Sequence, residues 1–184
     1  IPSPYTNTVA RNWCDIFTHM SILWLHFTVV FFLQLLLFLA HAYYEKKLAD
    51  IPHVLWQGAI TGIVFGPLFD LIGKYLGLFS YALGFSPFFL ALNAILLYGL
   101  FFANIMLMRH ARLLHFCIWT TVVVAVFEIT NVFIRLWTYT FAVPSLEYFI
   151  IAFGAPLGLT MIIALAWHQL LGHRFVFIDN IIKQ

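Results

Sequence analysis

The sequence predicts an all-α protein, a polytopic transmembrane bundle of about five helices that contains a tandem two-helix repeat. Of its 184 residues, 64% are hydrophobic and only 9% are charged, whereas soluble domains carry near 25% charged residues. Apolar stretches of about 20 residues, long enough to cross a bilayer, recur along the chain, and the alternating pattern of a membrane β-barrel is absent. The composition excludes a soluble globule and a disordered chain, and a net charge of +2 is too small for a nucleic-acid-binding surface.

Short polar breaks separate the apolar stretches and set the expected helix boundaries. The expected membrane spans are residues 19–43, 54–76, 86–108, 113–134 and 147–171. The chain is expected to form a single transmembrane domain over 1–184. Its parts are an N-terminal helix unit (1–53), a first repeat (54–111), a second repeat (112–171) and a tail (172–184).

The distribution of Lys and Arg predicts an orientation in the membrane. Six of these residues lie on one side of the expected spans and three on the other. The larger group consists of Lys46, Lys47, Arg109, Arg112, Arg174 and Lys183. Because cytoplasmic loops are enriched in Lys and Arg, we expect the N-terminus outside and the C-terminus in the cytoplasm.

The chain resembles itself at an offset of 58 residues, which predicts an internal repeat. Phe69-Asp70 aligns with Phe127-Glu128, Leu78–Tyr81 with Leu136–Tyr139, and Ser86-Pro87 with Pro144-Ser145. Each unit is expected to contain a helix ending in an acid, an aromatic-x-Tyr loop, a proline and a second helix.

Two carboxyl groups inside expected spans are the leading functional candidates. Acids in a span cost about 2.5–3.5 kcal/mol on insertion scales, so each invites a functional hypothesis. We expect the second and fourth spans to pack together with Asp70 and Glu128 turned into one cavity, where their pKa values would separate into an acid and a base. The structural alternatives are an i,i+4 pair of Asp70 with Lys74, and contacts of Glu128 with Arg135 or Asn131.

The aromatic residues beside these acids also have two interpretations. Phe79, Tyr81, Trp137 and Tyr139 form an interfacial belt by default. If their loops fold back over the acids, the ring faces would instead stabilise a carbocation in a pocket.

These residues resemble the small integral-membrane carotenoid enzymes, namely the heterodimer-type lycopene cyclases and the related carotenoid hydratases, and they are similar to the membrane terpene cyclases. The likeness covers roughly residues 54–171. It rests on Asp70-x-x-Gly73-x-x-x-Gly77-x-Phe79-x-Tyr81, on Glu128 with Trp137-x-Tyr139, and on Val143-Pro144-Ser145-Leu146-Glu147-Tyr148-Phe149.

The resemblance implies a cyclase or hydratase that acts on polyprenyl chains by acid-initiated carbocation chemistry, without a cofactor or a metal. The implied catalytic residues are Glu128, Asp70 and Glu147, and the implied substrate-binding residues are Phe79, Tyr81, Trp137, Tyr139 and Asn131. The chain departs from the family pattern where Leu146 replaces the first of two adjacent acids and where Asn131 replaces a glycine. Five spans are fewer than the family's six or seven, which suggests a partner membrane subunit or a homo-oligomer.

The eight histidines are expected to lie mostly at a membrane interface. Haem ligation by a histidine pair is conceivable, but no helix carries two deep histidines far apart. His41 and Glu45 have i,i+4 spacing, and one such pair alone does not make a metal site. The glycines at 58, 62 and 66 are interpreted as a helix-packing surface.

Two further functions stay open at this point. The chain could be a non-catalytic membrane subunit that scaffolds a complex or binds a lipid or pigment, because some of the family's acids are missing. A transporter is a weaker third reading, since two acids could relay protons but the expected repeats are parallel.

Overall fold

The computed structural model describes the chain except for residues 1–3, 82–86, 135–136, 171–173 and 183–184. Side chains are described from residue 21 onward within these limits, apart from those of residues 23 and 132–134. Within the described residues the regular structure is helical except for two three-residue strands, which confirms the all-α class.

In the part of the chain that the structure describes, five helices are long and apolar enough to cross a membrane, as the sequence predicts. They are Trp24–Tyr44, Leu48–Tyr75, Pro87–His110, Leu113–Asn131 and Leu146–Leu170. Large aliphatic and aromatic side chains remain exposed along them, for example Leu36 and Trp56, which is the pattern expected when lipid is the solvent. The chain is a multi-pass integral membrane protein.

Along the chain, one short strand follows the second span and another follows the fourth span. The first part comprises α1 (Pro4–Tyr44), the 3₁₀ turn η1 (Leu48–Asp50), α2 (Ile51–Tyr75) and β1 (Phe79–Tyr81). The third span consists of α3 (Pro87–Asn93), the π turn η2 (Ala94–Tyr98), α4 (Gly99–Leu107) and the 3₁₀ turn η3 (Met108–His110). The remainder is α5 (Leu113–Ile134), β2 (Trp137–Tyr139), α6 (Leu146–Phe149), the π turn η4 (Ile150–Gly154), α7 (Ala155–Leu170) and α8 (Val176–Ile182).

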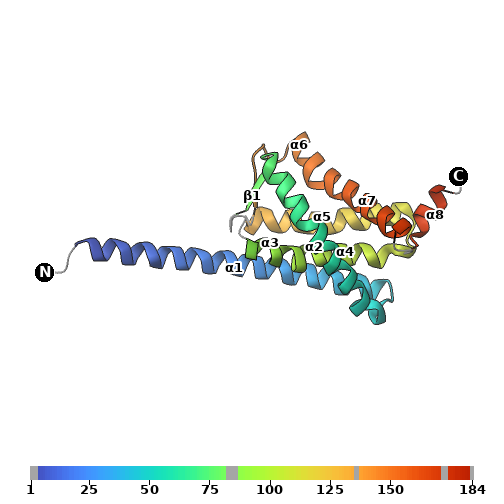
Figure 1. The fold of residues 1–184 in the computed structure, drawn as a ribbon, viewed down its shortest axis with the longest axis horizontal. Coiled ribbons are helices and arrows are strands. Elements are labelled where there is room, and N and C mark those ends of the chain that lie inside the picture. The colour runs from blue at the N-terminus through green and yellow to red at the C-terminus, as the bar shows by residue number, and fades with distance from the viewer. Residues whose placement is uncertain (1–3, 82–86, 135–136, 171–173, 183–184) are drawn as a thin grey trace.

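The bundle has two distinct ends (Figure 1). β1 lies at one end, while the turn that follows α1 and the short helix α8 lie at the opposite end. The N-terminal part of α1 extends beyond the other helices. A site at one end is therefore separated from a site at the other by most of a membrane thickness.

The third span forms the centre of the bundle, and α2 packs closely against it. Every residue of α4 is buried. A Cβ atom at Gly58 or Gly62 would collide with the main-chain oxygen of Gly99 or Ala94, and one at Gly66 would lie 2.6 Å from the Tyr98 ring. The spaced glycines are thus a packing surface, as the sequence predicts, because only a bare backbone lets the two helices approach so closely.

Among the described residues, the second and fourth spans do not form the extensive direct interface expected from the sequence. α2 packs mainly on η2 and α4, whereas α5 packs on α1, α4 and α7. The third span therefore joins the two helices that carry the acids. The physical reason is the glycine surface of α2, which receives the third span.

A short antiparallel ribbon replaces the loops expected around residues 78–81 and 136–139. β1 and β2 pair so that Ser80 lies opposite Thr138 and Tyr81 lies opposite Trp137. The Ser80 and Thr138 hydroxyls are 3.0 Å apart, and the amide of Thr140 donates to the carbonyl of Leu78 at 3.1 Å. The pairing satisfies main-chain polar groups at the end of the bundle.

Candidate functional site

The Asp70 carboxyl group lies fully buried near the end of α2 and is surrounded by hydrogen-bond donors. Its exposed fraction is 0%. The Tyr98 and Tyr81 hydroxyls donate to its Oδ1 atom over 2.6 and 2.7 Å, and the Asn93 amide donates to Oδ2 over 3.1 Å. These donors occupy both carboxyl oxygens, so a buried acid is held without an opposite charge among its hydrogen-bond partners.

The Glu128 carboxyl group has a similar but less complete set of donors. It is 7% exposed on α5. The Tyr139 hydroxyl donates to Oε1 over 2.7 Å, and the Tyr148 hydroxyl donates to Oε2 over 3.2 Å. Glu128 therefore keeps one short and one long hydrogen bond, whereas Asp70 receives three.

The ribbon at the end of the bundle places the first tyrosine of each set. Tyr81 follows Asp70 by eleven residues, and Tyr139 follows Glu128 by the same number. Asn131 fixes the second strand, because its side chain accepts from the Trp137 amide and donates to the Trp137 carbonyl, each over 2.9 Å. Antiparallel pairing of the strands then brings both tyrosines back over their helices.

The second tyrosine of each set comes from the helical segment that follows the ribbon strand of that set. Tyr98 ends the π turn η2, and π turns often occur at functional sites because they interrupt regular helical spacing. Tyr148 lies in α6, whose first turn is capped by the Ser145 hydroxyl accepting from the Tyr148 amide over 3.1 Å. Each carboxyl thus joins three segments of the chain.

A mainly apolar cavity of about 100 Å³ lies between the two carboxyl sets. Glu128 lines the cavity directly. On the other side the cavity is lined by Tyr81, Tyr98 and Asn93, the three hydrogen-bond donors to Asp70. The other aromatic residues of the cavity wall are Phe69, Phe79, Phe101, Phe127, Trp137 and Tyr139. A second hollow next to it shares Glu128, Trp137 and Tyr139 and includes Asn131 and Tyr148.

The structure brings most of the predicted site residues together. Glu128, Phe79, Tyr81, Trp137 and Tyr139 all line the cavity. These four aromatic side chains are therefore not simply an interfacial belt, because they face the interior between the carboxyl groups.

The other predicted residues occupy different places. Asp70 stands behind Tyr81 and Tyr98, which it contacts, rather than at the cavity wall. Asn131 holds the Trp137 main chain and borders only the outer hollow. Glu147 lies exposed in the first turn of α6, away from both lining sets. Arg135, the alternative partner of Glu128, lies outside the described residues.

The tyrosine hydroxyls outside the spans are protonated donors at neutral pH. Burial, followed by the nearby Asp70 carboxyl, holds the pKa of Tyr81 well above its usual value. Burial, followed by the nearby Glu128 carboxyl, likewise raises the pKa of Tyr139. Both hydroxyls therefore donate hydrogen bonds and do not carry charge into the cavity.

Sequence reasoning missed two tyrosines of the site. Tyr98 and Tyr148 each donate a hydrogen bond to one of the two carboxyls. Tyr148 lies beside Glu147 in the proline-containing segment, and only the acid of this pair was predicted to belong to the site. Polar residues in otherwise apolar spans were the available signal, because such residues require partners in lipid.

Comparison with protein-family models, with curated proteins and with solved structures finds no match for this chain. The site must therefore be interpreted from its own geometry.

Proposed function

We propose that the protein is a membrane-embedded enzyme that transforms an isoprenoid chain by acid-initiated carbocation chemistry, as a cyclase or a hydratase. The observation that carries the proposal is the shared cavity: Glu128 and the tyrosine partners of Asp70 line one aromatic space. The likeness of the sequence to membrane carotenoid enzymes points to the same chemistry. The proposed ligand is lipophilic, which suits a site inside a transmembrane bundle.

Glu128 is the proposed proton donor. It is the carboxyl that borders the cavity, and it has fewer hydrogen-bond donors than Asp70. Asp70 acts as a positioning residue, because it contacts the cavity through its hydrogen-bond donors Tyr81, Tyr98 and Asn93 and does not line it. The hydrogen bonds between Asp70 and Tyr81, Tyr98 and Asn93 fix these three side chains along the cavity wall.

The reaction begins when the Glu128 carboxyl transfers its proton to an alkene carbon. The π electrons form the new C–H bond, the neighbouring carbon becomes a cation, and Glu128 becomes a carboxylate. A second alkene of the same chain then attacks the cation and closes a ring, and loss of a proton to Glu128 restores an alkene. In the hydratase variant, water adds to the cation and its extra proton returns to Glu128.

The cavity wall suits this intermediate. Ring faces attract a cation through their quadrupoles, and Phe79, Phe127 and Trp137 line the space beside Glu128. The scarcity of other polar groups keeps bulk water away, which prevents premature capture of the cation.

The volume of the cavity restricts what it holds. An engineered cavity of about 150 Å³ binds benzene, so a space of about 100 Å³ holds about one isoprene unit. We infer that the enzyme acts on the end of a prenyl or carotenoid chain, and that the rest of the chain lies towards the outer hollow or lipid.

The proposed architecture is a tandem repeat with the site at its interface. Ser80 faces Thr138 at the predicted offset of 58 residues, and each acid precedes its strand tyrosine by eleven residues. A π turn follows the ribbon strand in each half, η2 in the first and η4 in the second. These correspondences support the repeat.

The proposed topology has the N-terminus outside and the C-terminus in the cytoplasm. Its support is the excess of Lys and Arg on one side of the spans. A partner membrane subunit or a second copy of the chain is part of the proposal, because five spans are fewer than the resembling enzymes have.

The test is conversion of linear carotenoid and prenyl substrates in membranes that contain each variant at matched protein level. Glu128→Gln preserves size and hydrogen bonding but removes the acidic proton, so the rate should fall about 10²–10⁴-fold. Asp50→Asn is the matched control, because this carboxyl pairs with Arg109 over 3.5 Å outside the cavity lining. Full activity of Glu128→Gln would contradict the proposal.

The second candidate function is lipid or pigment binding without chemistry, which the same cavity favours. Wild-type protein that retains a bound polyprenyl molecule unchanged, with equal binding by Glu128→Gln, would support this function over the enzyme.

A further inference from the structure

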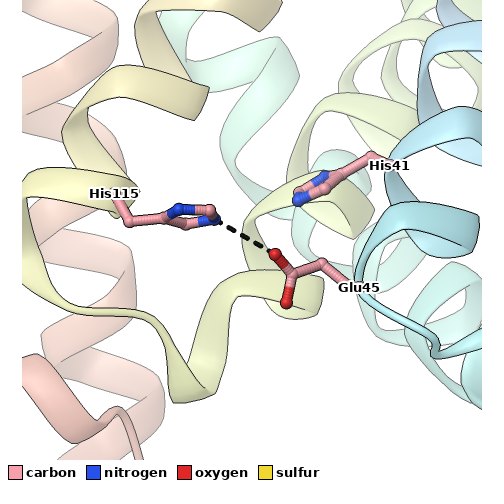
Figure 2. Close-up of side chains that lie close together, drawn as sticks. All are labelled: His41, Glu45 and His115. Atoms are coloured by element: carbon pink, nitrogen blue, oxygen red, sulfur yellow. Dashed lines mark hydrogen bonds and ion pairs between the residues drawn. The ribbon is translucent and has the colours of Figure 1, made fainter.

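The end of the bundle opposite the ribbon contains a cluster of three potential metal ligands. His41 lies in the last turn of α1, Glu45 follows in the turn after it, and His115 lies near the start of α5. One ligand atom from each residue lies within 4.8 Å of the other two. Figure 2 shows the imidazoles of His41 and His115 on either side of the Glu45 carboxylate.

We infer that His41, Glu45 and His115 bind a divalent transition-metal ion of the Zn²⁺ type, with water as the fourth ligand. This inference is independent of the proposed isoprenoid chemistry. His115 precedes Glu128 by thirteen residues on α5, which places the two sites about 20 Å apart along the helix. The sequence alone showed the His41–Glu45 pair and no metal site, because His115 joins it only through the packing of α5 on α1.

The strongest support is an unsatisfied nitrogen of His41. This side chain is 0% exposed, and its Nε2 atom is buried without a hydrogen-bond partner. A buried imidazole nitrogen without a partner is costly. A metal ion would satisfy it, since neutral imidazole is the commonest metal ligand among side chains.

The surroundings of His41 fix the tautomer that a metal ligand requires. Its Nδ1 atom lies 3.0 Å from Oδ1 of Asn104, and the Asn104 amide nitrogen donates to the Leu100 carbonyl over 3.0 Å. The Asn104 oxygen therefore faces His41 and accepts a hydrogen bond from the Nδ1–H group, which leaves the lone pair on Nε2. Metal-binding histidines are typically held by such a partner on the other ring nitrogen.

Aromatic packing fixes the orientation of the same ring. The His41 imidazole stacks on the Trp119 indole with a centroid separation of 4.3 Å and an interplanar angle of 14°. Trp119 also lies beside His115, with ring centroids 6.3 Å apart. One indole thus restrains both histidines, and it does so from the same helix that carries His115.

The distances on the other side of the cluster suit a tetrahedral ion. His115 Nε2 and Glu45 Oε1 are 3.1 Å apart. Bonds of about 2.0–2.1 Å to zinc place neighbouring tetrahedral ligand atoms about 3.3 Å apart. Glu45 Oε2 lies 3.9 Å from the Lys47 ammonium, so Oε1 is the carboxylate atom available to the metal.

The types of donor atom indicate the class of metal, and the exposure of the side chains shows how solvent reaches the site. Two imidazoles with one carboxylate suit Zn²⁺ and related transition metals, whereas Ca²⁺ and Mg²⁺ prefer oxygen ligands. The His115 and Glu45 side chains are 35% and 21% exposed, so solvent reaches the cluster and supplies the water ligand. A bound ion would join the end of α1 to the start of α5.

The test is a Zn²⁺ titration of the purified, chelator-washed protein in detergent, against a chromophoric competitor. Wild type should bind one equivalent. Glu45→Gln and His115→Ala should each weaken binding at least about 100-fold, and Asn104→Ala should weaken it about 10–100-fold. His110→Ala is the control, because this exposed histidine on the same face contacts Arg109 and should bind zinc like wild type.

Two results would overturn the site: folded wild type that binds no zinc, or Glu45→Gln and His115→Ala that bind it as wild type does. X-ray absorption of zinc-loaded wild type tests the site without any variant. It should show N/O ligands at about 2.0–2.1 Å with the outer-shell scattering of two imidazoles, and a spectrum without imidazole would also refute the site. Glu128→Gln should bind zinc like wild type. Zinc binding therefore tests the metal site separately from the isoprenoid proposal, and either proposal can fail without the other.

Discussion

Removal of the Tyr139 hydroxyl tests how the structure prepares Glu128 to release a proton. Tyr139→Phe keeps the ring that packs against Tyr148 at a centroid distance of 5.5 Å. It deletes the 2.7 Å hydrogen bond to Glu128 Oε1. That bond is strongest when proton transfer leaves Glu128 as a carboxylate, because hydrogen bonds to charged groups are worth about 1.5–3 kcal/mol.

The expected loss follows from that difference. Each 1.36 kcal/mol of transition-state stabilisation is about tenfold in rate, so Tyr139→Phe should slow conversion about 10- to 150-fold. Tyr148→Phe removes a longer bond of 3.2 Å. Its loss should be nearer the value of an ordinary hydrogen bond, about 0.5–1.5 kcal/mol, which corresponds to about 2- to 12-fold.

The assay is the initial rate of conversion of a linear prenyl or carotenoid substrate in membranes, normalised to folded protein. Tyr75→Phe is the matched control, because Tyr75 is 91% exposed at the end of α2. Wild-type activity of Tyr139→Phe would refute the reasoning. A larger loss in Tyr148→Phe than in Tyr139→Phe would refute it as well, since the order of the two distances would then not govern the effect.

Three further predictions follow from the placement of single residues. Glu147→Gln should leave the conversion rate within about twofold of wild type, because the exposed Glu147 lies outside the cavity; a large loss would return it to the site. Gly62→Val should lower the free energy of unfolding by about 1–3 kcal/mol through overpacking against the third span, whereas the exposed Ile63→Val should change the detergent unfolding curve little, and equal curves would contradict the packing. A double variant, Ser80→Cys with Thr138→Cys, should form a disulfide in a background without the native cysteines, because paired positions meet the geometry; absence of the band on a non-reducing gel would contradict the register.

Much of the fold could be predicted from hydropathy alone. The spans are long and apolar, and charged breaks such as Arg109–Arg112 separate them, so the helix count follows from bilayer thickness. The glycine spacing at 58, 62 and 66 also predicted a packing surface. It did not say which helix would occupy that surface, because any helix with a compatible face can pack on small residues.

The polar network of the site was predicted only in part. The acids and their strand tyrosines were found because they recur at a fixed offset. Tyr98 and Tyr148 were missed because their positions depend on irregular helices, Tyr98 at the end of the π turn η2 and Tyr148 just before η4, and local sequence does not define such turns. His115 was missed for a different reason: it reaches Glu45 across seventy residues of sequence, a contact made by tertiary packing alone.

Photo-crosslinking with a diazirine-bearing prenyl probe, followed by mass spectrometry, tests most directly whether the aromatic cavity is the substrate site. The account predicts that labelling concentrates on cavity residues such as Phe127 and Trp137, and that excess linear prenyl substrate suppresses it. Lipid-facing positions such as Trp56, which is 66% exposed, should be labelled weakly and without competition. Labelling confined to such exposed positions, or labelling of Phe127 and Trp137 that substrate does not suppress, would contradict the central claim.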